Sequence, residues 1–95
     1  MDYDKIKQAA EGYEPAMVKF LRELIAAPGE SSGEQAHAER ILREMQALAF
    51  DECFIDPQGN VIGYMGAGER IAAFDGHIDT VGIGLRDNWR FDPYE

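Results

Sequence analysis

The hydrophobic pattern of this chain changes once, near Phe50, and that change limits the folds the chain can adopt. Before this point apolar residues recur every three or four positions, which is the period of an amphipathic helix. After it they form short runs separated by glycine, proline, asparagine and aspartate, which is typical of strands and turns. The chain is therefore predicted to place two helices before three strands, in the order α-α-β-β-β.

The first helix is predicted from Tyr3 to Ala27. Its apolar stripe consists of Ile6, Ala9, Ala10, Tyr13, Met17, Phe20, Leu21, Leu24 and Ile25. Pro15 interrupts this pattern, and because proline removes one backbone hydrogen bond we expect a kink there or a fresh helix start near Glu14. Pro28 and Gly29 are expected to end the helix.

The second helix is predicted to start near Gly33 and to fade near Phe50. Two pairs before it have the capping-box spacing, namely Ser32 with Gln35 and Ser31 with Glu34. Its apolar face consists of Ala38, Ile41, Leu42, Met45, Leu48 and Ala49. His37 has charged neighbours on this helix, and we expect it at the surface.

Three short apolar runs predict the strands. Cys53–Ile55 and Val61–Met65 flank the turn residues Asp56–Asn60, where a proline and a glycine suit the corners, and this arrangement predicts a hairpin. The run from Arg70 to Asp75 has a continuous apolar centre, as expected of a strand covered on both faces. Residues 82–95 show no period and are expected to form a long loop with aromatic anchors.

Composition narrows the partners and the compartment. The chain of 95 residues makes at most one small domain, and its net charge of −9 argues against nucleic acid and anionic membranes as partners. Cys53 is the single cysteine, which excludes an intrachain disulfide and suits a reducing compartment. We find neither a secretion signal nor a membrane span in the sequence, so a cytoplasmic location is expected.

The segment Gly76-His77-Ile78-Asp79-Thr80-Val81 carries the chemistry, directly after the third apolar run. Residues two apart in an extended segment point to the same side, so His77 and Asp79 are expected to face one cleft. His77 could bind zinc through one ring nitrogen while Asp79 holds the other. The alternative is structural: Asp79 caps the turn and His77 packs at the strand end.

With this context the segment resembles the first signature of the M20 metallohydrolases, the dinuclear-zinc aminoacylases, carboxypeptidases, deacetylases and dipeptidases. The order of helices, hairpin and signature strand is similar along the whole chain. Trp89-Arg90-Phe91-Asp92-Pro93-Tyr94 is similar to the stretch that follows the signature in that family. The amino-acid sequence around both segments most resembles a branch of dipeptidase-like hydrolases linked to selenium metabolism.

The resemblance implies a fold and two site residues. Residues 1–95 would be the amino-terminal portion of an α/β/α zinc-peptidase catalytic domain, with helices packed on a mixed sheet. His77 matches the first metal-ligand histidine of the family, and Asp79 matches the catalytic aspartate that supports the site. The family's bridging aspartate, paired glutamates, later carboxylate and final histidine have no counterpart in this sequence, and neither does its lid or dimerisation domain.

The implied activity is metal-dependent hydrolysis of an amide bond in a small peptide or an N-acyl amino acid. In the intact enzyme two zinc ions, or Co²⁺ or Mn²⁺, would activate water while a carboxylate takes its proton. This chain would hold at most one ion weakly and is expected to be inactive alone, while the intact enzyme could be a homodimer. The alternative is a non-catalytic remnant that associates through an incomplete sheet. The sequence identifies no substrate-binding residue.

Overall fold

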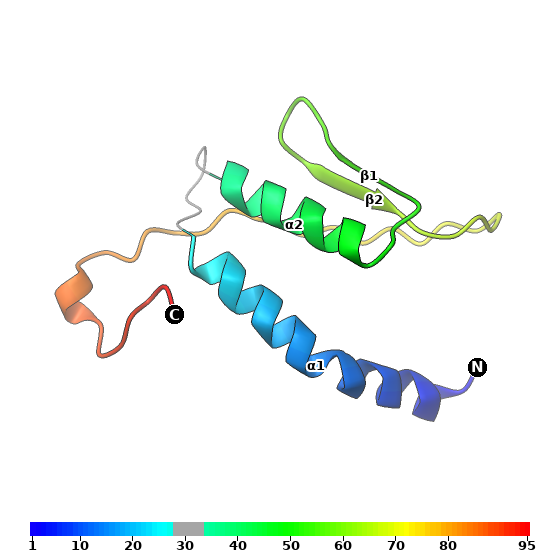
Figure 1. Ribbon diagram of the computed structural model, residues 1–95, viewed down its shortest axis with the longest axis horizontal. Coiled ribbons are helices and arrows are strands. Elements are labelled where there is room, and N and C mark those ends of the chain that lie inside the picture. Colours follow the sequence, from blue (N-terminus) through cyan, green and yellow to red (C-terminus); the bar gives the residue numbers. More distant parts are fainter. Residues whose placement is uncertain (28–33) are drawn as a thin grey trace.

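The computed structural model describes residues 1–27 and 34–95. In chain order its elements are helix α1 (Tyr3–Ile25), helix α2 (Gln35–Ala47), strand β1 (Glu52–Ile55), strand β2 (Val61–Tyr64) and the short 3-10 helix η1 (Arg86–Asn88) (Figure 1). The helices precede the strands, as the change in hydrophobic pattern predicts, and the α/β class is confirmed. The strands form a two-stranded sheet.

Helix α1 starts at a side-chain cap and continues through its proline. The Asp2 carboxylate accepts a hydrogen bond of 3.2 Å from the backbone N–H of Lys5. The expected fresh start near Glu14 is wrong, because the helix runs on through Pro15. No residue of α1 is buried, so water can solvate the carbonyl that loses its partner at the proline. Three predictions fall outside the described residues: the stop at Pro28 and Gly29, and the two capping pairs that use Ser31 and Ser32.

Arg40 of α2 joins the two helices. Its guanidinium lies 2.5 Å from the Glu23 carboxylate of α1 and 2.8 Å from that of Glu44 on α2. It also lies over the ring of Phe20, 4.8 Å from the ring centre. The hydrogen bond from Arg40 lowers the pKa of Glu23 below its usual value. A charged side chain with aligned partners therefore fixes how the two helices meet.

The predicted hairpin is confirmed. Strands β1 and β2 pair in antiparallel register, with Cys53 opposite Gly63. In the turn the Asp56 carboxylate accepts hydrogen bonds from the backbone N–H groups of Gln58 and Asn60, at 3.0 and 2.8 Å. It also accepts one of 2.9 Å from the side-chain amide of Asn60. Gly59 has a φ of +90°, which is the role predicted for the glycine.

Helix α2 packs on the hairpin, and Gly63 of β2 lies close to Met45 and to Phe50 beyond the helix end. A Cβ atom there would lie 2.6 Å from the Phe50 ring and 2.8 Å from the Met45 sulfur, so the position has no room for a side chain. Among the described residues only Ala38 and His37 are buried. Small apolar area therefore leaves polar contacts to determine much of the geometry.

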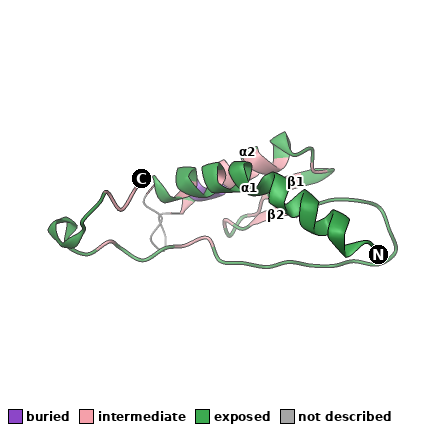
Figure 2. Ribbon diagram, turned by 90° about the horizontal axis from the view of Figure 1, so that it is seen from below, coloured by how far each residue is buried: buried purple, intermediate pink, exposed green. Residues whose placement is uncertain are grey.

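The strand predicted from Arg70 to Asp75 does not form. This segment belongs to no helix or strand, and it follows a long course outside the helices and the hairpin (Figure 2). A strand needs a neighbour to pair with and a layer to cover it, and the ring of Phe74 is instead 96% exposed. The radius of gyration is 16.1 Å, compared with about 12 Å for a compact domain of this length. Many large apolar side chains of the protein are therefore exposed to solvent.

The segment after Val81 folds back on itself through polar and aromatic contacts. The guanidinium of Arg86 donates to both oxygens of Asp92, at 3.2 and 2.8 Å. The indole N–H of Trp89 donates to the carbonyl of Ile83 at 2.8 Å. Its ring meets that of Phe91 edge-on, with 5.7 Å between centres. The two aromatic anchors are therefore confirmed as packing residues.

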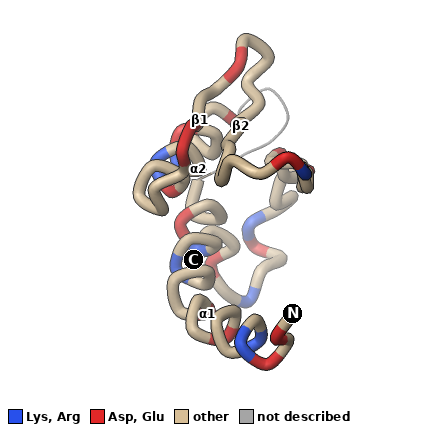
Figure 3. The backbone as a smooth tube through the Cα atoms, turned by 90° about the vertical axis from the view of Figure 1, so that its right-hand side faces the viewer, with Lys and Arg blue, Asp and Glu red and all other residues tan. Residues whose placement is uncertain are grey.

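The lysines of α1 pair with acidic residues. Basic and acidic residues lie next to one another along the helix (Figure 3), and its three lysines pair with acids. Those pairs are Lys5 with Asp2, Lys7 with Glu11, and Lys19 with Glu23. In the described part of the chain, no helix has the length and apolar character needed to cross a membrane.

Substitution Gly63→Ala is expected to destabilise the packing of α2 on the hairpin. The added methyl group overlaps the Phe50 ring, and overpacking of this kind typically costs about 1–3 kcal/mol. Urea unfolding followed by circular dichroism measures the effect. Gly68→Ala is the matched control, because its nearest heavy atom would be 4.0 Å away. Equal stability of the two variants would contradict the packing described here.

Acid is expected to open the hairpin turn. Hydrogen bonds, of which that from the Asn60 side chain is the strongest cause, lower the pKa of Asp56 below its usual 3.8. The carboxylate therefore stabilises the turn fully above pH 3.8, and this contribution is lost as the pH falls through the lower, folded-state value. The amide proton shift of Asn60, followed by NMR, should titrate below pH 3.8 and should lose this step in Asp56→Ala. A midpoint at or above that pH would refute the arrangement.

Candidate functional site

His77 and Asp79 lie on the same side of their segment and contact each other. The Nδ1 atom of His77 is 3.0 Å from the Oδ1 atom of Asp79 and 3.0 Å from its backbone carbonyl oxygen. This is the side on which an extended segment places residues two apart. The carboxylate therefore faces the imidazole, as the sequence predicts, although the preceding residues form no paired strand.

These two contacts determine where the proton of the neutral ring sits. A carboxylate oxygen and a carbonyl oxygen can only accept a hydrogen bond, so Nδ1 must be the donor. The Nε2 atom then carries the lone pair, which is the form of imidazole that binds a metal ion. The side chain of His77 is 85% exposed and that of Asp79 is about half exposed. The ring is therefore both oriented and accessible.

The donor atoms of the described residues fit one position of a zinc site. His77 supplies an oriented imidazole with a supporting carboxylate, which is the usual arrangement around catalytic zinc. Within residues 1–27 and 34–95, however, no group of three His, Cys, Asp or Glu side chains could hold a metal ion. Catalytic zinc normally takes three protein ligands. The described residues therefore offer one ligand and its support.

His37 is buried, and the expectation that it lies at the surface is wrong. Its ring is 3% exposed and lies between two backbone carbonyl groups. The Nδ1 atom is 3.1 Å from the oxygen of Ile78, and the Nε2 atom is 2.5 Å from that of Ala27. Sequence reasoning missed this residue because its neighbours are charged. It stands four positions before Ile41 on the apolar stripe of α2, and that spacing could have revealed it.

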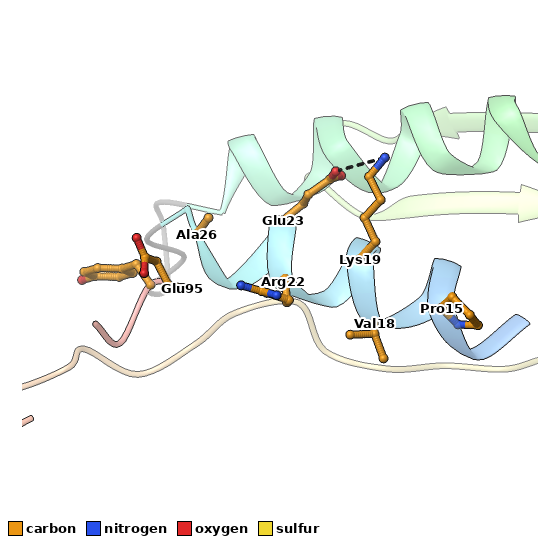
Figure 4. Close-up of a pocket in the computed structure, with 8 residues that line it drawn as sticks. Pro15, Val18, Lys19, Arg22, Glu23, Ala26 and Glu95 are labelled. Carbon is orange, nitrogen blue, oxygen red and sulfur yellow. Dashed lines mark ion pairs between the residues drawn. The ribbon is translucent and has the colours of Figure 1, made fainter. Parts of the chain in front are cut away.

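Two further features of the described residues are Cys53 and a groove beside α1. Cys53 of β1 is half-buried, so its thiol is neither fully enclosed nor fully exposed. A groove of about 490 Å³ lies along the last turns of α1, where Tyr94 and Glu95 approach the helix (Figure 4). Lys19 and Glu23 pair across its wall at 4.0 Å. Neither member of the His77–Asp79 pair lines this groove.

Comparison with known proteins gives one long and one short similarity. The chain is 51% identical over 90 residues to "Uncharacterized protein YgeY" of Escherichia coli K12, which covers 95% of this chain and 22% of that protein. It is 38% identical over 40 residues to a "Probable succinyl-diaminopimelate desuccinylase" of Staphylococcus epidermidis, which covers 42% of this chain and 10% of that protein.

The chain thus spans about a fifth of the length of the YgeY protein that it matches. No family model and no solved structure matches the chain. The short similarity to a desuccinylase is consistent with a hydrolase family. It covers less than half of the chain, so the activity itself is treated below as a proposal.

The neutral ring of His77 is expected to carry its proton mainly on Nδ1. Imidazole nitrogen shifts in ¹⁵N-histidine-labelled protein measure this tautomer directly. Asp79→Ala removes the carboxylate acceptor and is expected to move the ring toward a mixture of the two tautomers. Asp75→Ala is the matched control, since it removes the acid two residues to the other side of His77. An Nε2 proton in the parent chain would contradict the geometry.

Proposed function

We propose that this chain is the amino-terminal part of the catalytic domain of an M20-type metallohydrolase. Within that family we assign it to the dipeptidase-like branch that its sequence resembles. The substrate class is a small peptide or an N-acyl amino acid, cleaved at an amide bond. The observation that carries the proposal is the His77–Asp79 contact of 3.0 Å, which leaves an accessible Nε2 atom. The resemblance of the signature segment to the family motif suggests the reaction class.

Each of the two residues has a separate task in this proposal. His77 would be the first protein ligand of a pair of divalent cations, Zn²⁺ or alternatively Co²⁺ or Mn²⁺. Asp79 would accept a hydrogen bond from the Nδ1–H group, which orients the ring and makes Nε2 a stronger donor toward a metal. When bound, such a metal pair supplies Lewis-acid activation of water and of the scissile carbonyl.

The further ligands and the general base would come from other parts of a longer protein. The length of the relatives supports this proposal, because the chain matches 22% of YgeY. The name of the staphylococcal relative describes the removal of a succinyl group, which fits the N-acyl amino acid class. A cytoplasmic location, a homodimeric assembly and the absence of nucleic-acid or membrane partners are part of the same proposal. The net charge of −9 and the paired lysines of α1 support the last point.

A second candidate is association without catalysis. Large apolar side chains of the segment after β2 are uncovered, Ile71 and Phe74 among them. The sheet consists of β1 and β2 alone in the described residues, so each strand has an unpaired edge. Such edges pair readily with other chains. This candidate predicts concentration-dependent self-association and no effect of metal.

The complete enzyme is expected to lose zinc-dependent hydrolysis of N-acyl amino acids or dipeptides in His77→Ala. Asp79→Asn keeps the shape but weakens the support of the ligand, and such changes typically cost about 10- to 100-fold in metal affinity or activity. Hydrolysis assayed after chelation and zinc addition gives the comparison. Cys53→Ser is the control and should keep its activity.

The 95-residue chain by itself is expected to hydrolyse none of these substrates. It should bind one Zn²⁺ weakly in calorimetry, and His77→Ala should abolish that binding while Cys53→Ser retains it. Full activity of the complete enzyme without His77 would overturn the proposed function. Self-association without metal binding would favour the second candidate.

A further inference from the structure

Buried polar groups outside the candidate site can act on it through the backbone, and His37 is placed to do so. The residue lies in the first turn of α2, and its ring contacts two segments distant in sequence. Ala27 follows the end of α1, 10 positions earlier, and Ile78 lies 41 positions later. The ring therefore joins α1, α2 and the signature segment at one point.

We propose that His37 is a positioning residue that holds the Ile78 carbonyl and thereby sets the geometry of the His77–Asp79 pair. The Ile78 carbonyl belongs to the peptide unit that connects the two site residues. A bond to this oxygen restricts the rotation of that unit, and with it the direction from which the Asp79 carboxylate approaches the ring. The inference rests on the proposed function for the role given to His77.

The arrangement is specific to a side chain with donors at two ends. Both partners of the ring are carbonyl oxygens, which accept only. A neutral imidazole donates one of these bonds, to the Ile78 oxygen when its proton is on Nδ1, and a protonated imidazole donates both. At 3% exposure the ring has little access to water, so loss of its donors would leave buried acceptors without a partner. An apolar residue of similar shape could fill this space but could not hold the two carbonyls.

The surroundings make this anchor consequential. The described part of the signature segment belongs to no helix or strand; its Thr80 forms an isolated β-bridge, and Val81 is 91% exposed. With little apolar packing to restrain it, a hydrogen bond to the interior has a large share in its placement. His37 thus acts on the metal-binding imidazole through Ile78 without touching the substrate.

Histidine labelling tests the proposal cleanly, because the chain contains two histidines. In ¹⁵N-histidine-labelled His37→Phe only the His77 ring gives a signal. Its ratio of Nδ1–H to Nε2–H tautomer is expected to fall about fivefold, the change that corresponds to the loss of one ordinary hydrogen bond. His37→Gln, whose amide donates to carbonyl oxygens, is expected to retain most of the parent ratio.

Ala38→Gly is the matched control. It disturbs the neighbouring buried position and weakens the helix, but it leaves both hydrogen bonds of His37 in place. Its His77 ratio should equal that of the parent. The proposal would be overturned if His37→Phe, with intact hairpin signals, kept the His77 tautomer ratio of the parent. It would also be overturned if Ala38→Gly lowered that ratio as much as His37→Phe does. Should His37→Phe fail to fold, a fallen ratio in folded His37→Gln overturns it and a retained ratio supports it.

Addition of Zn²⁺ alone separates this proposal from the proposed function. A zinc-induced shift of the His77 Nε2 signal is expected in the parent and a weaker one in His37→Phe. If zinc shifts nothing in the parent while the tautomer ratio still depends on His37, positioning stands and the metal role of His77 fails. If zinc binds equally in both proteins and the ratio is unchanged, the metal role stands and positioning by His37 fails.

Discussion

Directional polar contacts made by α2 are the constraint on which the arrangement of this chain depends. The helix lies against α1 on one side and against the hairpin on the other, and it provides both of the buried residues among those described. Arg40 binds Glu23 of α1, and the His37 ring meets the signature segment. A small chain cannot bury enough apolar surface to fix such relationships by packing alone, so bond direction has to supply the precision.

The same reasoning connects the scaffold to the chemistry. His77 is accessible and Asp79 determines which of its nitrogens is free, and neither residue lies in a helix or a strand. A metal ligand is precisely placed only if the residue that orients it is itself held in position by further contacts. The path from α1 through the His37 ring to the Ile78 carbonyl provides that second level. It ties the orientation of one exposed imidazole to the junction of two helices.

The parts of the fold that depend on neighbouring residues could be predicted from the sequence. The parts that depend on contacts between distant residues could not. The two helices and the hairpin follow from apolar spacing and from the chemistry of Asp56 and Gly59, all within a few residues. The run from Arg70 to Asp75 has the composition of a buried strand, yet a strand exists only where another chain segment pairs with it. The His77–Asp79 contact followed from a two-residue spacing. The place of His37 on the apolar stripe of α2 is a local signal for its burial, but its hydrogen-bonding partners lie 10 and 41 positions away, and no local pattern identifies them.

The uncovered course of the segment after β2 has a consequence for the life of the polypeptide during its synthesis. Phe74 and its apolar neighbours emerge from the ribosome after the hairpin has the residues it needs to close, and in the described structure they remain exposed. Until something shields that stretch, it is a natural target for chaperones that grip extended hydrophobic peptide.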